Sequence, residues 1–402
     1  LEGAGLLFRQ GVPPHASYLF KHALVQDAAY GTLLREPRRE LHARIAEALE
    51  TQFHEIAENQ PELLARHCTE AGLVSKAAKL WGKAGLRSLE RSALVEAVEQ
   101  LSRALDQIEP LSAEPASRRE RLKLQVAIIA PLIHVKGYAS EETKAAVERA
   151  HRLIEEAETQ GDPPEDPLLL FSVLYASVIA HQIAFDGEAF RESAVQFLAL
   201  AESRKAAIPI MVGHRLTANS LLLTGSAVKG RVHFDQAIAR YNTLEHRGLV
   251  TRFGQDSRVS GLAYRSIALW MLGCPDAALT DADNAISDAR EIGQAATLMF
   301  ALQVTFIALM LCGEYAAANS NLDNLIALAN EKDTLYWKAE GLLDKGCILA
   351  LTGKHSEAID TITSWIAPFR STGATWNIPT YLLFLASAHA ELGNFSNCLL
   401  YT

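Results

Sequence analysis

Four glycines recur at one fixed interval in the second half of the chain. They are Gly273, Gly313, Gly353 and Gly393, and each stands 40 residues after the one before. A strict internal period is the signature of a repeat protein, in which similar units stack along one axis. This period constrains the fold more than any other feature of the sequence.

Leucines and small residues keep fixed places around each glycine. A leucine stands eleven residues before it and a small residue five residues after it: Leu262, Leu302, Leu342 and Leu382, and Ala278, Ala318, Ala358 and Cys398. Another leucine, such as Leu269, stands four residues before the first three glycines, and His389 before the fourth. The two leucines are seven residues apart and share one helical face. Each unit is therefore predicted to be two antiparallel helices that turn at the glycine and cross at the small residue.

The repeat pattern is looser toward the N-terminus. The helices expected there cover 74–90, 93–109, 115–134, 141–160, 167–185 and 207–224. Asp186-Gly187 is expected to close the fifth of these, and Gly225 the sixth. A longer turn is then expected from Gly225 to Gly230, before a return helix that contains Ala237.

The predicted fold is an all-α, tetratricopeptide-like helical-repeat solenoid over residues 56–402. About eight helical pairs are expected, with the last one cut short. A period of 40 exceeds the typical tetratricopeptide length of ~34 and falls within the range of HEAT and armadillo repeats. Small residues at the crossing of each pair favour the tetratricopeptide-like alternative, with longer helices absorbing the extra residues.

Composition excludes several classes of partner. The chain has 47 acidic and 38 basic side chains, a formal charge of −9, which disfavours binding to nucleic acid. The basic residues near 35–44 and 118–123 alternate with glutamates, so we interpret them as solvated helix faces, with docking of a charged ligand or domain as the alternative. The apolar runs 168–185 and 298–312 are interrupted or short, and we expect core helices there rather than membrane spans. The five cysteines form no C-x-x-C pair, which favours a reducing cytoplasm.

No motif for catalysis, a cofactor or a metal is complete in this chain. Gly82-Lys83 and Gly353-Lys354 lack the glycine that a phosphate loop needs five residues before its second glycine. His67 and Cys68 are adjacent, so on a helix they diverge and do not grip one metal ion. We therefore expect no catalytic residue, no metal site and no cofactor in the chain itself.

Aromatic residues recur along the repeat region. They are Tyr264, Trp270, Phe300, Phe306, Tyr336, Trp337, Trp365, Trp376 and Tyr381. We interpret most of them as packing between repeats. Others are candidates to line a concave groove that binds a protein or peptide.

The N-terminal stretch from Tyr18 to Tyr30, YLFKHALVQDAAY, is unlike the repeats and is followed by Leu33-Leu34, Arg38 and Leu41-His42. It resembles the end of the ATPase module in bacterial signalling proteins that join a class III adenylate/guanylate cyclase, a STAND/AAA-type ATPase and a tetratricopeptide tail. The segments 253–256 and 268–279, with Gly137-Tyr138, are similar to that tail.

The resemblance implies that residues 1–55 are the end of a winged-helix module and that an ATPase binding ATP or ADP lies upstream. It also implies that His22 contacts the β-phosphate of ADP in the longer protein. A protonated imidazole donates a strong hydrogen bond to phosphate. The alternative is a histidine that only packs within the winged helix.

The leading functional hypothesis is a non-catalytic regulatory scaffold, the sensor arm of a multidomain signalling ATPase. The array would bind a protein or peptide and contact the upstream ATPase of the same chain, with no direct nucleic-acid or membrane partner. A second hypothesis is a fragment of a nucleotide cyclase whose catalytic domain lies upstream. A third is the effector-sensing part of an ATPase-type transcription regulator.

Overall fold

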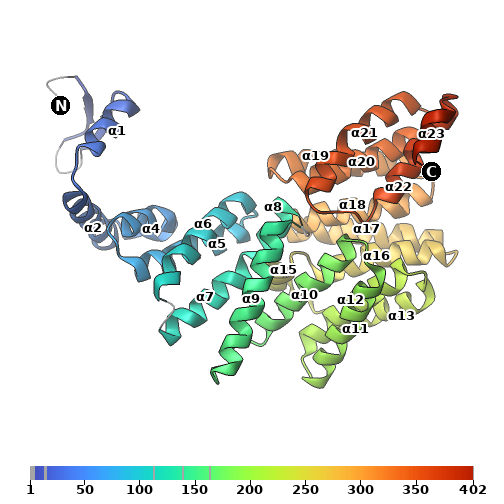
Figure 1. The fold of residues 1–402 in the computed structure, drawn as a ribbon, viewed down its shortest axis with the longest axis horizontal. Helices are drawn as coiled ribbons and strands as arrows, with labels where there is room; N and C mark the ends of the chain where they lie inside the picture. The colour runs from blue at the N-terminus through green and yellow to red at the C-terminus, as the bar shows by residue number, and fades with distance from the viewer. Residues whose placement is uncertain (1–4, 13–15, 112–113, 138–139, 163, 402) are drawn as a thin grey trace.

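The computed structural model describes residues 5–12, 16–111, 114–137, 140–162 and 164–401. Almost every element in them is a helix (Figure 1). The one sheet among these residues is an antiparallel hairpin of β1 (Leu7–Gln10) and β2 (Ser17–Phe20), with Leu7 opposite Phe20. The predicted all-α, tetratricopeptide-like solenoid is confirmed.

The helices follow one another with short connections. In the first part of the chain they are α1 (Ala23–Gly31), α2 (Arg35–Thr51), α3 (His54–Asn59), α4 (Pro61–Glu70), α5 (Val74–Glu90), α6 (Leu94–Ile108), η1 (Glu109–Leu111), α7 (Pro115–Ala127), α8 (Ile129–Lys136) and α9 (Glu141–Thr159). The middle part contains α10 (Leu168–Ile183), α11 (Gly187–Ser203), α12 (Ala207–Leu223), α13 (Ala227–Ala239), α14 (Thr243–His246), η2 (Arg247–Leu249) and α15 (Val250–Phe253). The last part contains α16 (Ser257–Met271), α17 (Pro275–Ile292), α18 (Ala295–Leu311), α19 (Tyr315–Glu331), α20 (Leu335–Leu351), α21 (His355–Ser371), α22 (Ile378–Glu391) and α23 (Phe395–Tyr401).

The 40-residue repeat corresponds to the pairs α16/α17, α18/α19, α20/α21 and α22/α23. Each of the four turn glycines adopts the left-handed conformation, with φ between 74° and 81°, which a side chain would disfavour. Ala278, Ala318 and Ala358 are fully buried where the two helices of a pair meet. The first helices of adjacent repeats also pack against each other, as α16 with α18 and α20 with α22, so their apolar faces are covered by the adjacent repeats.

Pro131 breaks one of the predicted helices. The sequence predicts a single helix over 115–134, but the structure ends α7 at Ala127 and starts α8 at Ile129. Pro131 has no N–H to donate to the carbonyl of Ala127, so the helical hydrogen-bond ladder stops there. The interpretation of 115–134 as one helix was therefore wrong, although α7 and α8 both pack against α9.

Two predicted turns also differ from the structure. No long turn follows Gly225, because α13 begins at Ala227 and contains Gly230. A Cβ at Gly230 would lie 3.1 Å from the carbonyl oxygen of Ala218, so this glycine permits the close crossing of α12 and α13. At the end of α10 it is Phe185, with φ 59°, that makes the left-handed turn, while Gly187 opens α11.

The solenoid coils back on itself, so that parts of its first half contact parts of its second half, and we call these contacts the closure. The hydroxyl of Ser92 accepts a hydrogen bond from the backbone N–H of Ala295 at 3.1 Å, across 203 residues of sequence. The carbonyl of Ile183 accepts from the backbone N–H groups of Thr375 and Trp376, at 3.0 and 3.1 Å. Figure 1 shows the consequence, with α8 lying beside the helices of the C-terminal part.

A buried histidine holds part of this closure. Trp337 on α20 donates its indole N–H to Nδ1 of His134 on α8 at 3.3 Å, and Nε2 of His134 lies 3.0 Å from the carbonyl oxygen of Gly254. The first contact uses His134 as acceptor, so Nε2 carries the proton and donates it. Burial lowers the pKa of His134 to about 4, which keeps the ring neutral as this geometry requires.

An irregular segment between α13 and α16 packs against α8 and α10 through α15. It comprises α14, η2 and α15, and Phe253 at its end packs edge-on against Tyr175 of α10, with ring centroids 5.4 Å apart. Gly254 follows with φ 73°, and Asp256 caps α16 by accepting from the N–H groups of Arg258 and Val259. The 253–256 motif singled out in the sequence is thus a structural joint of the array.

The N-terminal segment from β1 to α2 has almost no core of its own. No residue of α1 is buried, and α2 buries only His42 and Ala46. Leu24 is 80% exposed and Leu34 77% exposed. In Figure 1 the segment projects away from the array, to which α2 is joined by packing on α4.

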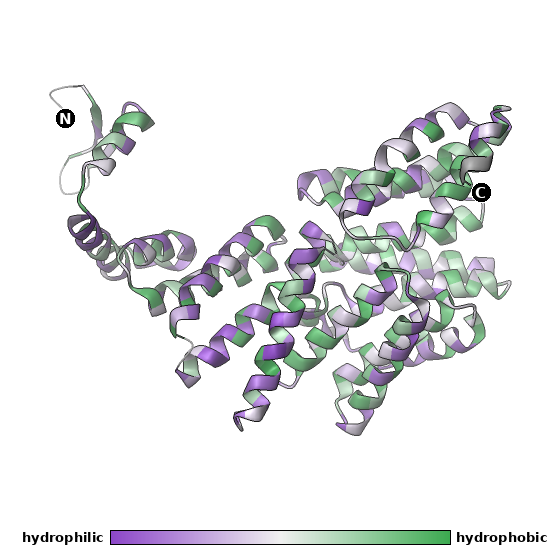
Figure 2. Ribbon diagram, in the orientation of Figure 1, coloured by the Kyte–Doolittle hydropathy of each residue, from purple (hydrophilic) through white to green (hydrophobic). Residues whose placement is uncertain are grey.

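The apolar runs at 168–185 and 298–312 form α10 and α18, which are buried on most of their faces. Hydrophobic residues lie along the packed helices of the array (Figure 2). None of the described helices is both long and apolar enough to cross a membrane.

Candidate functional site

His22 lies at the exposed start of α1. Its backbone carbonyl accepts from the N–H of Val25 at 3.0 Å, and its side chain makes no capping bond with the helix. The phosphate contact implied for His22 involves an ATPase outside these residues, so it stays a prediction.

Histidines meet in pairs rather than in larger groups. Nδ1 of His42 lies 2.8 Å from Nδ1 of His67, and Nδ1 of His214 lies 3.0 Å from Nδ1 of His233. Burial is the main cause that lowers the pKa of His67, His214 and His233. Within the described ranges, no three His, Cys, Asp or Glu side chains gather as metal ligands do.

The most unusual chemistry lies inside the closed solenoid. Six polar or charged side chains from α10, α12, α18 and α20 are buried there, and we call them the interior polar cluster: Gln182, Arg215, Asn219, Gln303, Glu340 and Asp344. Buried polar groups normally find hydrogen-bond partners, because an unsatisfied one weakens the fold. The partners of these six therefore show whether the cluster is structural or a site.

Arg215 is buried without a carboxylate. Its side chain is 0% exposed, its Nη1 donates to the hydroxyl of Ser260 at 2.9 Å, and its guanidinium carbon lies 5.3 Å from the ring centre of Tyr175. Neither Nε nor Nη2 has a hydrogen-bond partner. One turn further along α12, Asn219 is 1% exposed, and both polar atoms of its amide also lack a partner.

Glu340 and Asp344, one turn apart on α20, form the opposite side of the cluster. Asp344 accepts from the hydroxyl of Tyr381 at 3.0 Å and from Nε2 of Gln303 at 3.3 Å. Glu340 accepts from the indole N–H of Trp376 at 3.1 Å and from the hydroxyl of Tyr336, while its Oε2 has no partner within hydrogen-bond distance. Burial raises the pKa of Asp344 to about 7, and burial together with the charge of Asp344 raises the pKa of Glu340.

Aromatic side chains lie between the α12 residues and the α20 residues of the cluster. Asn219 and Gln182 line one small cavity together with Tyr264, Phe300 and Trp376, and its volume is about 20 Å³. Gln182 donates to the hydroxyl of Tyr264 at 2.8 Å. Burial first, and then the charge of Glu340, raises the pKa of Tyr264, while Arg215 lowers it, so both charged groups act on this one hydroxyl.

The connection between α21 and α22 covers this cavity. It consists of residues 372–377, in which Thr372 and Ala374 are buried. Its Trp376 contacts the cluster through Glu340, and its backbone is bonded to Ile183. Only a few hydrogen bonds hold this short covering segment over the interior.

The recurrent aromatic residues mostly pack between repeats, as the sequence predicts. Tyr264, Phe300, Phe306, Tyr336, Trp337 and Tyr381 are all buried. Tyr264, Phe300, Tyr336 and Trp337 line one small cavity beside the interior polar cluster.

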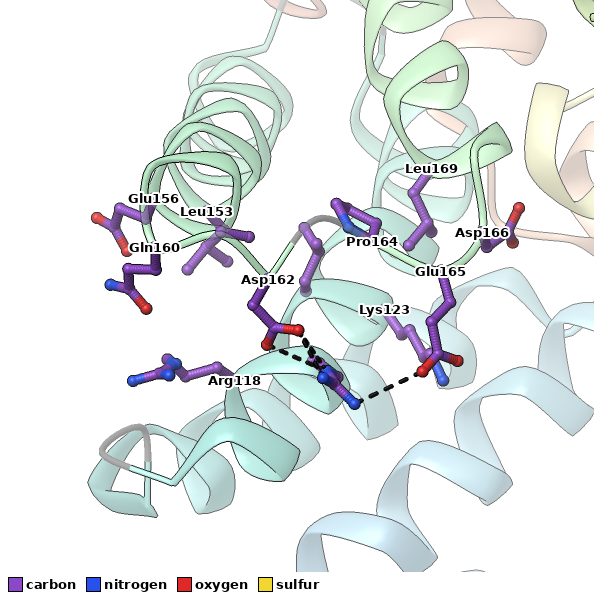
Figure 3. Close-up of a pocket in the computed structure, with 13 residues that line it drawn as sticks. Arg118, Lys123, Leu153, Glu156, Gln160, Asp162, Pro164, Glu165, Asp166 and Leu169 are labelled. Carbon is purple, nitrogen blue, oxygen red and sulfur yellow. Dashed lines mark hydrogen bonds and ion pairs between the residues drawn. The ribbon is translucent and has the colours of Figure 1, made fainter.

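A second cleft lies on the outer surface between α7, α9 and the start of α10 (Figure 3). Leu153 and Leu169 form its apolar wall, and its volume is about 50 Å³. Arg119 donates to Asp162 through Nε at 3.1 Å and through Nη2 at 2.5 Å, and its Nη1 lies 3.5 Å from Glu165. The charge of Arg119 is therefore balanced by two carboxylates from the connection between α9 and α10.

A wider cleft of about 440 Å³ adjoins it, between α5, α7 and α15. Leu86, Leu124 and Thr251 line part of it, and Arg252 pairs with Asp166 at 2.5 Å across its edge. In the two clefts the main charged groups already pair with each other. In the interior polar cluster several donors and acceptors have no hydrogen-bond partner and could bind a ligand. The interior is therefore the stronger candidate.

Sequence reasoning did not identify the interior polar cluster. A signal was present in the spacing, since Arg215 and Asn219 are four residues apart in an otherwise apolar helix, as are Glu340 and Asp344. Such pairs share one helical face. Whether that face meets water or the core depends on closure of the solenoid, which the 40-residue period does not encode.

No protein-family model matches the sequence. An uncharacterized protein of Rhizobium meliloti (strain 1021) is 28% identical over 286 residues, which cover 69% of this chain and 26% of that protein. The chain thus spans about a quarter of the length of this relative.

Solved structures with a similar arrangement of helices include a Rap protein complexed with Competence and Sporulation Factor. It has a TM-score of 0.54 and 11% sequence identity, over 81% of this chain and 96% of that one. A STAND protein with a tetratricopeptide repeat sensor from Pyrococcus horikoshii has a TM-score of 0.47 and 13% identity, over 99% of this chain and 56% of that one. The Rap likeness supports the helical-repeat fold and nothing finer.

Proposed function

We propose that the chain is a non-catalytic regulatory scaffold, the sensor arm of a multidomain signalling ATPase. The exposed apolar surface of the N-terminal segment is the observation that carries this proposal. A two-stranded hairpin with a helix is marginally stable by itself, and exposed apolar patches mark interaction sites. We infer that this surface docks on the end of an ATPase module in a longer protein, where residues 1–55 would complete a winged helix.

The array supplies what a sensor needs. Its interior holds open polar groups, and the same interior is bounded by contacts that join the first and second halves of the chain. A protein, peptide or smaller effector that binds there would change the balance between closed and open arrays. Since α2 links the N-terminal segment to the array, such a change would reach the nucleotide-binding module.

ATP hydrolysis by the longer protein tests the proposal. Leu24→Asp introduces a charge on the exposed surface of α1, and we expect it to change the hydrolysis rate several-fold by disturbing docking. Leu244→Asp is a matched control, because Leu244 is 95% exposed on α14, and should leave the rate unchanged. Equal rates for wild type, Leu24→Asp and a protein lacking residues 60–402 would refute a sensor role.

A further inference from the structure

The unpartnered edge of Arg215 has the geometry of a carboxylate receptor. Nε–H and Nη2–H point in the same direction within the plane of the guanidinium, and they form a fork that donates to both oxygens of one carboxylate. Both atoms are buried and neither has a hydrogen-bond partner. The third nitrogen, Nη1, is held by Ser260, which fixes the orientation of the fork.

Asn219 adds a second recognition element. Its carboxamide offers one acceptor and one donor, and neither is used within the protein. These are the two groups that pair with the N–H and C=O of an amide. Arg215 and Asn219 lie one helical turn, about 5.4 Å, apart along α12, so a single small molecule can reach both.

The cavity next to Asn219 limits what such a molecule can be. Phe300, Trp337 and Trp376 present aromatic surface, which suits an apolar body. A phosphate monoester carries close to two negative charges, whereas the guanidinium of Arg215 balances one, so a monocarboxylate fits better. The free Oε2 of Glu340 remains as a site for a donor on the ligand.

We propose that the interior polar cluster binds a small monocarboxylic acid with an amide next to the carboxylate. Acylated amino acids and the C-terminal ends of short peptides both have this chemistry. The cavity of about 20 Å³ holds about one water molecule, so binding requires the covering segment 372–377 to move. This movement breaks the bonds of the segment to Ile183 and Glu340.

This inference assigns the sensing site of the proposed function, but its test needs only the chain itself. The probes are N-acetylleucine, the dipeptide alanyl-leucine, and N-acetylleucine amide, which lacks the carboxylate. Binding is followed by tryptophan fluorescence, since Trp337 and Trp376 line the cavity, and by the thermal unfolding midpoint. Both carboxylate probes should bind and raise the midpoint, and the amide should do neither.

Variants locate the site. Arg215→Met should weaken binding about 100-fold, because two charge-assisted hydrogen bonds are lost. Asn219→Leu should weaken it about 10-fold. Arg103→Met is the control, since Arg103 is an exposed residue of α6 that pairs with Glu99, and it should bind as wild type does.

The outcomes separate the alternatives. Tighter binding of alanyl-leucine than of N-acetylleucine would assign the free oxygen of Glu340 to a peptide amine, and the reverse would assign the site to acylated amino acids. Unchanged affinity in a folded Arg215→Met variant would overturn the proposal, as would failure of both carboxylate probes to bind at millimolar concentration. A failed ATPase experiment with normal ligand binding would refute the coupling alone.

Discussion

Replacing Arg215 by methionine should stabilise the protein. Arg215 has one hydrogen bond, to Ser260, and one ring contact, with Tyr175. These contribute roughly 2 to 4 kcal/mol together, from a charged hydrogen bond and a desolvated cation–π contact. Removing the guanidinium from water costs about that much or more, because burial of a charge carries an effective penalty of several kcal/mol.

Methionine fills a similar space and has no charge to desolvate. Replacing buried ionic groups by apolar ones of similar volume is often neutral or stabilising by about 1 to 4 kcal/mol. We therefore expect the free energy of unfolding of Arg215→Met to rise by about 1 to 3 kcal/mol. The thermal midpoint should rise by about 2 to 5 °C.

Arg265 on α16 provides the matched control. It donates to both oxygens of Asp281, at 2.7 and 3.0 Å, and to Asp235 at 2.7 Å. Asp281 is itself buried, so Arg265→Met leaves an unpaired carboxylate and should lower the free energy of unfolding by about 1 to 3 kcal/mol. Urea denaturation followed by circular dichroism measures both variants.

Opposite signs for the two arginines are the required result. A loss of more than about 1 kcal/mol in Arg215→Met, similar to that in Arg265→Met, would mean that Arg215 is a structural residue that the fold needs. The reasoning about an unsatisfied buried charge would then fail.

Three further changes follow from the packing. Asp344→Asn should flatten the pH dependence of stability, because the pKa of Asp344 rises from 3.8 to about 7 on folding. The folded state therefore keeps a proton that the unfolded chain releases, and the stability of the wild type falls as the pH rises from about 4 to 7, whereas that of the variant does not. Unfolding at a series of pH values tests this, and parallel profiles would contradict it. Gly137 has φ 103°, and a Cβ at this position would lie 2.6 Å from the carbonyl oxygen of Thr372. Gly137→Ala should therefore destabilise the closure by about 2 kcal/mol and increase the radius of gyration measured by solution scattering. An unchanged radius would contradict this prediction. Gly346→Ala should lower the free energy of unfolding by about 1 to 3 kcal/mol, since its Cβ would lie 2.5 Å from Cγ1 of the buried Ile362. A higher unfolding temperature of the variant in calorimetry would contradict this prediction.

Local chemistry made the repeat predictable. The turn glycines and the small residues at helix crossings act within one unit, so their spacing alone predicts the pairs from α16 to α23. Gly225 and Gly230 follow the same rule, one as the turn glycine and the other as the small residue at the crossing, so the prediction of a long turn between them was wrong. Phe185 was missed because a phenylalanine in the left-handed conformation has no local signal.

The contacts that close the solenoid could not be predicted from the sequence. Its contacts, such as Ser92 with Ala295 and His134 with Trp337, join residues that are 203 positions apart. Nothing in the local pattern of either partner indicates the other. The interior polar cluster is defined by this closure, so it could be recognised only once the two halves of the chain were placed together.

Most solenoids behave as one-dimensional stacks, in which each repeat senses only its neighbours and unfolding can begin at either end. The bonds between Ile183 and the segment at Thr375 and Trp376 give this array a clasp. This link joins repeats that are far apart in the sequence, so strain passes directly from α10 to the C-terminal repeats. We expect α10 and these repeats to lose their order together as one cooperative unit.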